Sequence, residues 1–289
     1  MYITVNGAKL FFDVDGEQLS PDGPAMREKP TVVMVHGGPG GDHSVAKPFF
    51  SQLTDMAQVV YYDHRGNGRS DLCDESTWNL DQWSDDLKAF CDALGIIKPI
   101  VIGTSFGGFV TIAYATRYPD HASGIALIST AAKVDFPAVY NAFEKLGGPA
   151  LRDIASAYWE NPTDEGRALY RDRCVPLYSY KKDASTDWLS RVMWRNETAL
   201  WFNGPKNEHG RFDYRKDLEN IRRPVLVMVG EEDPITPAEF SEAIVAGLGS
   251  DKVTYHRFEH CGHGVTGDRP DEALDALRTF VADCAAPGK

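Results

Sequence analysis

The sequence is poor in cysteine for its length, and it shows no paired cysteine motif. Five cysteines stand among 289 residues, at Cys73, Cys91, Cys174, Cys261 and Cys284. Their number is odd and no short paired spacing joins them, which argues against a disulfide framework and against a zinc site. This pattern is typical of a reducing compartment, and we expect a cytoplasmic protein.

Basic residues and long apolar runs are also scarce. The chain has 30 Lys and Arg against 42 Asp and Glu, a formal net charge of −12, and no basic run that would attract nucleic acid. No apolar run reaches the roughly 20 residues of a membrane helix, and the N-terminus lacks a signal-peptide pattern. We expect a soluble monomer or small homo-oligomer that acts on a small molecule or short peptide, with no nucleic-acid or membrane partner and no cofactor.

Short apolar runs rich in Val and Ile alternate with helical patterns along most of the chain. The runs lie at 31–37, 58–64, 99–105, 124–130, 224–230 and 252–260. Between two of them, LDQWSDDLKAFCDALG places its apolar residues on one helical face and ends at Gly95. Near-continuous apolar strands that alternate with helices predict an α/β fold with a parallel sheet covered on both faces. The N-terminal MYITVNGAKLFFDVDG predicts a strand pair.

One interval, from Ala131 to about Arg222, breaks this alternation because it contains no strand pattern. A structureless loop of that length is improbable in a compact domain, so we interpret the interval as a helical insertion. It holds four of the six tryptophans of the chain, Trp159, Trp188, Trp194 and Trp201. These aromatic residues form either the small core of the insertion or part of a substrate pocket beneath it.

The stretch VIGTSFGG has the form Gly-x-Ser-x-Gly around Ser105. It follows the strand pattern PIVIG and opens the helical run GGFVTIAYATRYP, which is the strand–turn–helix context of a nucleophile elbow. The flanking glycines permit a strained turn and a close approach of helix and strand. Ser105 is therefore the predicted nucleophile.

A serine nucleophile needs a base that takes its proton and an acid that orients the base. Where the serine stands on an elbow of this kind, the acid and then the histidine follow it along the chain. Of Glu231, Glu232 and Asp233, we assign Asp233 because it directly precedes a proline turn, whereas the two glutamates can be solvated loop charges. For the base we assign His263, between two glycines in a loop, and keep His260 as the alternative.

Two backbone N–H donors must stabilise the oxyanion of the tetrahedral intermediate, one of them from the residue after the nucleophile. Phe106 follows Ser105 and supplies this donor. The loop VHGGPGG follows an earlier strand pattern, and we assign Gly38 as the second donor with Gly37 as the alternative. His36 in the same loop is assigned a structural role.

Two further motifs have competing explanations. His260, Cys261 and His263 could form half of a metal site, but no second ligand cluster accompanies them, and no metal is predicted. The stretch DHRGNGRSD, residues 63–71, lacks the GK[ST] ending of a phosphate loop. We interpret it as a rigid turn whose Arg and Asp side chains brace the oxyanion loop.

Together, HGGPGG, DHRGNGRS, GTSFGG, GEEDPITP and CGHG resemble the α/β-hydrolases and, more narrowly, the proline iminopeptidase family, where these motifs occur in the same order. The resemblance extends from about Tyr2 to the C-terminal helix. It implies an α/β-hydrolase fold, with a mostly parallel central sheet flanked by helices. It also implies a core of residues 1–130 and 223–289, a helical cap of residues 131–222, and the catalytic and oxyanion residues assigned above.

One position departs from that family, whose members usually have a Trp followed by a Glu in the cap, where the carboxylate holds the α-ammonium group of the substrate. Here Trp194 precedes Arg195 and the nearest carboxylate is Glu197, so Trp194 and Glu197 are the candidate pocket residues. The leading hypothesis is a serine hydrolase that forms an acyl-enzyme and releases an N-terminal residue from small peptides. The alternative is a carboxylesterase, lactonase or amidase for a small acyl substrate. Outside hydrolysis, the alternatives are a lyase with the same triad and a non-catalytic binding protein.

Overall fold

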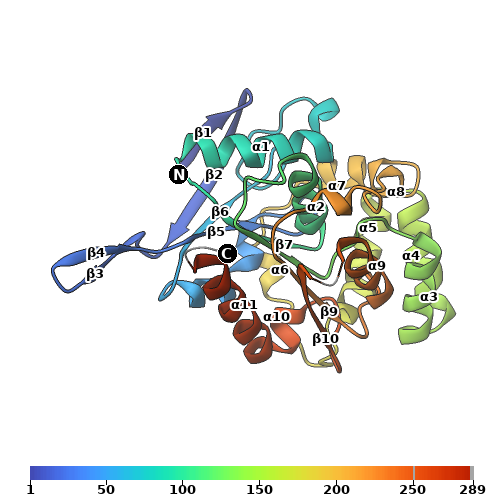
Figure 1. Ribbon diagram of the computed structural model, residues 1–289. Helices are drawn as coiled ribbons and strands as arrows, with labels where there is room; N and C mark the ends of the chain where they lie inside the picture. The colour runs from blue at the N-terminus through green and yellow to red at the C-terminus, as the bar shows by residue number, and fades with distance from the viewer. Residues whose placement is uncertain (250, 287–289) are drawn as a thin grey trace.

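The computed structural model describes residues 1–249 and 251–286, and its centre is an eight-stranded sheet of order β1-β2-β6-β5-β7-β8-β9-β10 (Figure 1). Its strands are β1 (Tyr2–Val5), β2 (Ala8–Asp15), β5 (Thr31–Val35), β6 (Gln58–Tyr62), β7 (Ile100–Thr104), β8 (Gly124–Ile128), β9 (Val225–Gly230) and β10 (Val253–Phe258). The β1–β2 and β2–β6 pairs are antiparallel, and the other pairs are parallel. The mostly parallel sheet, the predicted strands and the N-terminal strand pair are confirmed.

Helices cover both faces of this sheet, which explains why its central strands are apolar throughout. All residues of β5 are buried, and alternate residues enter two different apolar clusters: Val33 and Val35 one, Val32 and Met34 the other. The first cluster includes residues of α1 (Leu80–Ala93), α2 (Phe106–Arg117) and α9 (Ala238–Leu248). The second includes residues of η1 (His43–Ala46), η2 (Phe49–Leu53), α10 (Val265–Asp268) and α11 (Pro270–Ala285).

Local sequence determines where helix α1 begins, which face it buries and where it ends. The side chain of Asn79 accepts a hydrogen bond from the Gln82 N–H and caps the helix start. The apolar face predicted from the sequence is buried against the sheet. The helix ends at Ala93, two residues before Gly95, whose φ of 67° is the left-handed conformation that favours glycine.

Helices fill the segment between β8 and β9. They are α3 (Phe136–Gly147), α4 (Pro149–Glu160), α5 (Asp164–Arg173), η4 (Val175–Tyr178), α6 (Trp188–Arg191), α7 (Asn196–Phe202), α8 (Glu208–Arg211) and η5 (Leu218–Asn220). No strand occurs at residues 131–222, all of which the structure describes. In Figure 1, α3, α4 and α5 lie together at one end of the molecule. That these helices form a cap domain with the predicted boundaries stays a prediction.

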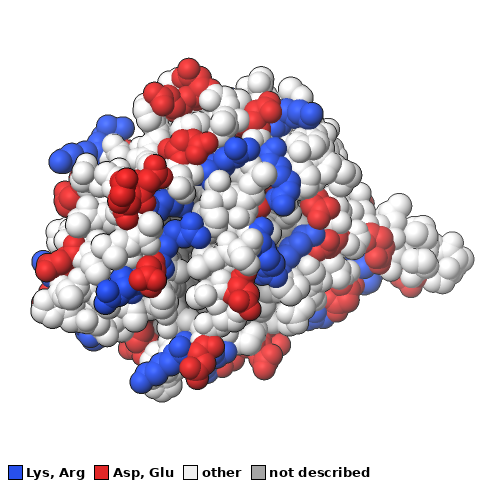
Figure 2. All heavy atoms as spheres, turned by 180° about the vertical axis from the view of Figure 1, so that it is seen from behind, with Lys and Arg blue, Asp and Glu red and all other residues white. Residues whose placement is uncertain are grey.

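One element was not predicted. Strands β3 (Leu19–Asp22) and β4 (Ala25–Glu28) pair in a separate hairpin that projects from the body of the molecule (Figures 1 and 2). Its residues are almost all exposed, so it has no apolar alternation that a sequence pattern could reveal. On the face that Figure 2 shows, basic and acidic side chains are interspersed. Among the described residues, no helix is both long and apolar enough to span a bilayer.

The sheet topology brings several loops to one edge. Strand β5 pairs with β6 on one side and β7 on the other, so the strand order reverses there. The parallel register aligns the strand ends, with Val35 opposite Gly103 and Gly230 opposite Phe258. The loops after β5, β7, β9 and β10 therefore leave the same edge, where α/β proteins bind their ligands.

This edge requires a close approach of α2 to β5, and we predict that Gly107→Ala destabilises the protein. A Cβ at Gly107 would collide with the carbonyl oxygens of Val35 and His36. We expect the free energy of unfolding to fall by about 1–3 kcal/mol, the usual cost of overpacking, as measured by urea denaturation. The control is Gly267→Ala, where a Cβ meets no atom within 4 Å. Equal stability of the two variants would contradict the close-packing argument.

Candidate active site

Ser105 stands on a strained turn between β7 and α2. Its φ of 55° and ψ of −121° are unusual for a residue with a side chain. The turn is held on both sides, because the Ser105 N–H donates to the Ile128 carbonyl at 2.9 Å and the Thr130 hydroxyl donates to the Ser105 carbonyl at 2.9 Å. A Cβ at Gly103 or Gly108 would collide with neighbouring atoms. The glycines of the motif are therefore required by the packing around this turn.

Loops from three strand ends bring Ser105, His263 and Asp233 together. His263 Nε2 lies 3.0 Å from Ser105 Oγ, and His263 Nδ1 lies 2.8 Å from Asp233 Oδ2. The Asp233 side chain is fully buried, whereas that of His263 is 10% exposed. If Nδ1 carries the hydrogen and donates it to Asp233, Nε2 is free to accept the serine proton. This is the geometry of a nucleophile, a base and an orienting acid.

The surroundings of Asp233 keep it ionised. Burial by itself would raise the pKa of this carboxyl, but His263 and hydrogen bonds from Thr236 outweigh it and lower the pKa below its usual value. One oxygen accepts from the Ile235 N–H at 2.8 Å and the Thr236 N–H at 2.9 Å, and the other from the Thr236 hydroxyl at 2.7 Å. Thr236 lies in the GEEDPITP motif but was assigned no role there, and it fixes the orientation of the acid.

The alternatives to the acid and the base lie elsewhere. Glu231 forms an ion pair with Arg257 at 2.7 Å. Glu232 accepts a hydrogen bond from the Cys261 N–H at 3.0 Å and so holds the histidine loop, a role that the sequence did not suggest. His260 is exposed, and its ring centroid lies 5.0 Å from that of Tyr180.

Further contacts fix the loop that carries His263. The Ser129 hydroxyl donates to the His263 carbonyl at 2.8 Å. The buried carboxylate of Asp268 accepts from the Gly262 N–H and from the Tyr180 N–H, both at 2.8 Å. Because Tyr180 belongs to the segment between β8 and β9, Asp268 joins that segment to the histidine loop. Neither Ser129 nor Asp268 stood in a recognisable motif.

The loop after β5 and the start of α2 lie beside the serine. A Cβ on Gly37 would stand 3.4 Å from Ser105 Cβ, so the loop after β5 passes next to the nucleophile. Phe106 is the first residue of α2, where the N–H groups have no partner within the helix. Among the described residues, neither the Phe106 N–H nor the Gly38 N–H has a hydrogen-bond acceptor. Both N–H groups remain available to an oxyanion.

His36 pins the oxyanion loop. Its Nε2 accepts from the His64 N–H at 3.3 Å, so the hydrogen of the neutral ring is on Nδ1, which donates to the Gly37 carbonyl at 2.7 Å. Burial lowers the pKa of His36 and favours this neutral form. The side chain has the structural role predicted for it.

The turn at residues 63–71 braces the same loop. Asn67 Oδ1 accepts from the Gly40 N–H at 2.6 Å, and Arg69 binds Asp42 at 2.7 Å. The interpretation of this stretch as a brace is confirmed, with two differences. Asn67, rather than an Arg or Asp, contacts the backbone of the oxyanion loop directly. Arg65 instead forms a bidentate ion pair with the buried Asp86.

The two candidate pocket residues, Trp194 and Glu197, differ in burial and in contacts. Trp194 is half-buried, and its Cζ3 would stand 3.6 Å from a Cβ on Gly41 in the oxyanion loop. Glu197 is exposed in the first turn of α7 and forms no hydrogen bond or ion pair with another described residue. The Arg195 N–H donates to the Gly40 carbonyl at 2.7 Å, so the segment before α7 is pinned to the oxyanion loop.

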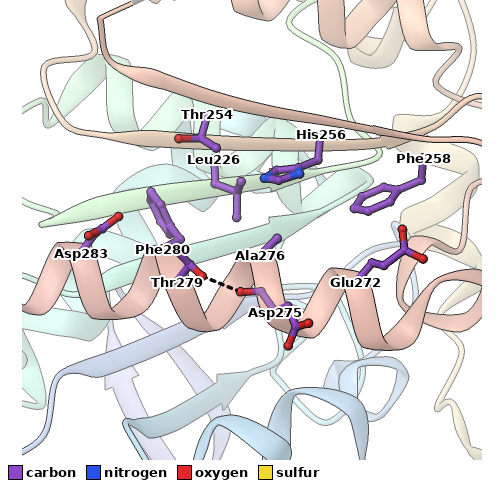
Figure 3. Close-up of a pocket in the computed structure, with 10 residues that line it drawn as sticks. All are labelled: Leu226, Thr254, His256, Phe258, Glu272, Asp275, Ala276, Thr279, Phe280 and Asp283. Carbon is purple, nitrogen blue, oxygen red and sulfur yellow. Dashed lines mark hydrogen bonds between the residues drawn. The ribbon is translucent and has the colours of Figure 1, made fainter.

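A separate hollow of about 400 Å³ lies between β10 and α11 (Figure 3). It is lined by Leu226, Thr254, His256, Phe258, Glu272, Asp275, Ala276, Thr279, Phe280 and Asp283. None of these residues belongs to the triad or to the oxyanion loop. Across residues 1–249 and 251–286, no group of three or more His, Cys, Asp or Glu side chains could hold a metal ion.

Comparison with known proteins shows the family and the fold of the chain. The family model described as alpha/beta hydrolase fold matches residues 30–270. A proline iminopeptidase of Pestalotiopsis fici is 28% identical, over 97% of this chain and 98% of that protein. A Caulobacter sp. protein, named provisionally as a carbamate hydrolase, is 29% identical over 98% of both chains.

A solved structure shows the same fold. The crystal structure of proline iminopeptidase from Mycobacterium smegmatis superposes with a TM-score of 0.77 and 20% identity, over 98% of both chains. At this identity the likeness concerns the fold alone. With the family match over most of its length, the chain belongs to the α/β-hydrolase fold family, in which it is similar to the proline iminopeptidases.

Proposed function

We propose that this hydrolase acts through a serine mechanism, with Ser105, His263 and Asp233 forming and then hydrolysing an acyl-enzyme. The observation that supports it most strongly is the pair of hydrogen bonds that links the three side chains, at 3.0 Å and 2.8 Å. A protein that only binds a ligand has no need of this arrangement. The strained backbone at Ser105 is further support, since strain of this kind concentrates at functional sites.

The geometry assigns a role to each group in the proposed reaction. Ser105 Oγ attacks the substrate carbonyl carbon while His263 Nε2 takes its proton and then gives it to the leaving group. Water hydrolyses the acyl-enzyme by the same steps in reverse, with His263 as base and then acid. The N–H groups of Phe106 and Gly38 stabilise the oxyanion, and a single donor of this kind contributes about 2.7–4 kcal/mol to the transition state.

For the substrate, we favour a small ester, lactone or amide. The carboxylate of Glu197 is exposed, and Arg195, which follows Trp194, is a cation whose N–H is bonded to the oxyanion loop. Neither residue is therefore suited to hold the α-ammonium group of a peptide. The second candidate is release of an N-terminal residue from short peptides, which the 28% identical proline iminopeptidase favours. In both cases residues 131–222 are proposed to act as a cap over the site.

The serine mechanism predicts that Ser105→Ala abolishes hydrolysis. Loss of a serine nucleophile lowers kcat by about 10⁴–10⁶-fold in enzymes of this type. Intact protein should react with a fluorophosphonate probe at one site, and the variant should not, as detected by mass spectrometry. Ser76→Ala, which removes an exposed hydroxyl in η3 (Glu75–Thr77) outside the triad and its loops, is the control and should still be labelled. Equal labelling of wild type and Ser105→Ala would exclude Ser105 as the nucleophile.

The lowered pKa of Asp233 predicts a pH-dependent contribution to stability. Because its folded-state pKa lies below its unfolded value of about 3.9, the carboxylate stabilises the fold above that pH and loses this effect as the pH falls through the folded value. Between pH 6 and pH 3, the free energy of unfolding of wild type should therefore fall by more than that of Asp233→Asn. Urea denaturation of both proteins at the two pH values measures this difference.

In the same variant, kcat should fall by about 10⁴-fold because the imidazole loses its orienting acid. A parallel acid dependence of stability in both proteins would show that Asp233 is not preferentially ionised in the fold. Retention of full activity would show that the imidazole does not depend on it.

The two substrate candidates can be separated directly. We expect measurable hydrolysis of p-nitrophenyl acetate and little or none of prolyl-β-naphthylamide, because Glu197, the carboxylate nearest to Trp194 in the sequence, is exposed and is not held in place for a free ammonium group. The kcat/KM values of the two compounds, measured with one enzyme preparation and with Ser105→Ala as the blank, decide the question. Faster turnover of the prolyl compound would reverse our preference.

A further inference from the structure

Two arginines of α5 stack on Trp194. The guanidinium carbon of Arg171 lies 4.5 Å from the centroid of the Trp194 ring, and that of Arg167 lies 5.4 Å from it. Residues four apart on a helix share one face, which explains how both side chains reach the same ring. Two positive charges are thereby held close to one side chain of the segment before α7.

These two charges lack an acidic partner among residues 1–249 and 251–286. Arg167 is only 7% exposed, yet its one hydrogen bond is from Nη1 to the neutral Tyr158 hydroxyl at 3.3 Å, and its Nε is buried without an acceptor. Arg171 forms no ion pair or hydrogen bond. The carboxylate of Asp164, one turn earlier on α5, accepts a hydrogen bond from Asn196 instead.

Two other arginines of this protein, one buried and one half-buried, have an acidic partner. Arg65 is paired with Asp86, and Arg69 with Asp42. Burial and the nearby charge of Arg167 lower the pKa of Arg171, which shows that the two cations face an unfavourable environment. Two such cations held together without an anion destabilise a fold, and a bound anion would offset this cost.

The arginine pair is connected to the reacting groups by two routes. Trp194 packs on Gly41 of the oxyanion loop. In addition, the Tyr158 ring lies 4.8 Å from that of Tyr170, whose hydroxyl lies 3.0 Å from the Tyr178 hydroxyl. The Tyr178 ring lies 5.1 Å from that of His263. These contacts link the pair to the oxyanion loop directly through Trp194, and to His263 through the three tyrosines.

We propose that Arg167 and Arg171 form an anion subsite beside Trp194 that binds a carboxylate carried by the substrate, away from the bond that is cleaved. The planar guanidinium group suits this task, because it donates two parallel hydrogen bonds to a carboxylate and stacks on an aromatic ring. The inference rests on the proposed function, since it takes the substrate of Ser105 as the ligand. It narrows that substrate to an anionic ester, lactone or amide.

The test uses two matched pairs of esters. In the first, p-nitrophenyl hemiglutarate carries a carboxylate in its acyl part and p-nitrophenyl pentanoate does not. In the second, 4-acetoxybenzoate carries a carboxylate in its leaving group and its methyl ester does not. Wild type should prefer the anionic ester of one pair, and that pair identifies which side of the scissile bond faces the arginines.

The variant is Arg171→Met, and the matched control is Arg173→Met on the same helix, where the side chain is exposed. Arg171→Met should lower kcat/KM for the preferred anionic ester by about 10- to 100-fold, the value of charge-assisted hydrogen bonds, and change the neutral ester less than about two-fold. Arg171→Lys should restore part of the loss and Arg173→Met should have no effect. Equal losses for both members of each pair, or none, would overturn the subsite.

A binding measurement separates this inference from the proposed function. If wild type hydrolyses none of the four esters, the proposed ester substrate has failed, while the serine mechanism is still judged by fluorophosphonate labelling of Ser105, and the subsite is tested with glutarate alone. Glutarate should then raise the Tm of wild type but not that of Arg171→Met. No shift in either protein would reject the subsite independently of catalysis.

Discussion

The hydrogen bond between His263 Nε2 and Ser105 Oγ joins two loops that are 158 residues apart in the sequence, and the remainder of the site depends on it. The sheet makes this contact possible because β7, β9 and β10 are parallel and end at one edge. Each partner is then fixed locally, the serine by a strained turn held from β8 and the histidine by Asp233, Ser129 and the loop contacts of Asp268. A base that is held in this way loses little entropy when the reaction begins.

The oxyanion loop is held from two sides, by the core and by the segment before α7. Asn67 and Arg69 bind it from the turn after β6, while Arg195 bonds to Gly40 from the other side. The Met193 N–H also donates to Asp42 at 3.0 Å. In the proposed mechanism, a substrate that contacts the segment around Trp194 also contacts, through these hydrogen bonds, the loop that carries Gly38.

Much of this arrangement could be predicted from sequence, since it depends on patterns that are local. The apolar runs predict the parallel strands, and the glycines around Ser105 predict a turn that packing confirms. Contacts made by single polar residues far apart in the chain could not be predicted. Asp268 and Asn67 stand in no periodic pattern, and their roles arise only when loops meet. Thr236 makes a local contact, with Asp233 three residues away, to which no role had been assigned. The β3–β4 hairpin was missed because it is exposed on both faces. The stacking of Arg167 on Trp194 joins a helix to the non-helical segment between α6 and α7, which no local pattern predicts.

The most direct test of the account is a crystal structure of the protein after reaction with a fluorophosphonate, whose tetrahedral phosphorus resembles the reaction intermediate. The account predicts phosphorus bonded to Ser105 Oγ, the phosphoryl oxygen within hydrogen-bond distance of the N–H groups of Phe106 and Gly38, and His263 still bonded to Asp233. Phosphorus on another residue, or a phosphoryl oxygen directed away from the loop after β5, would contradict it.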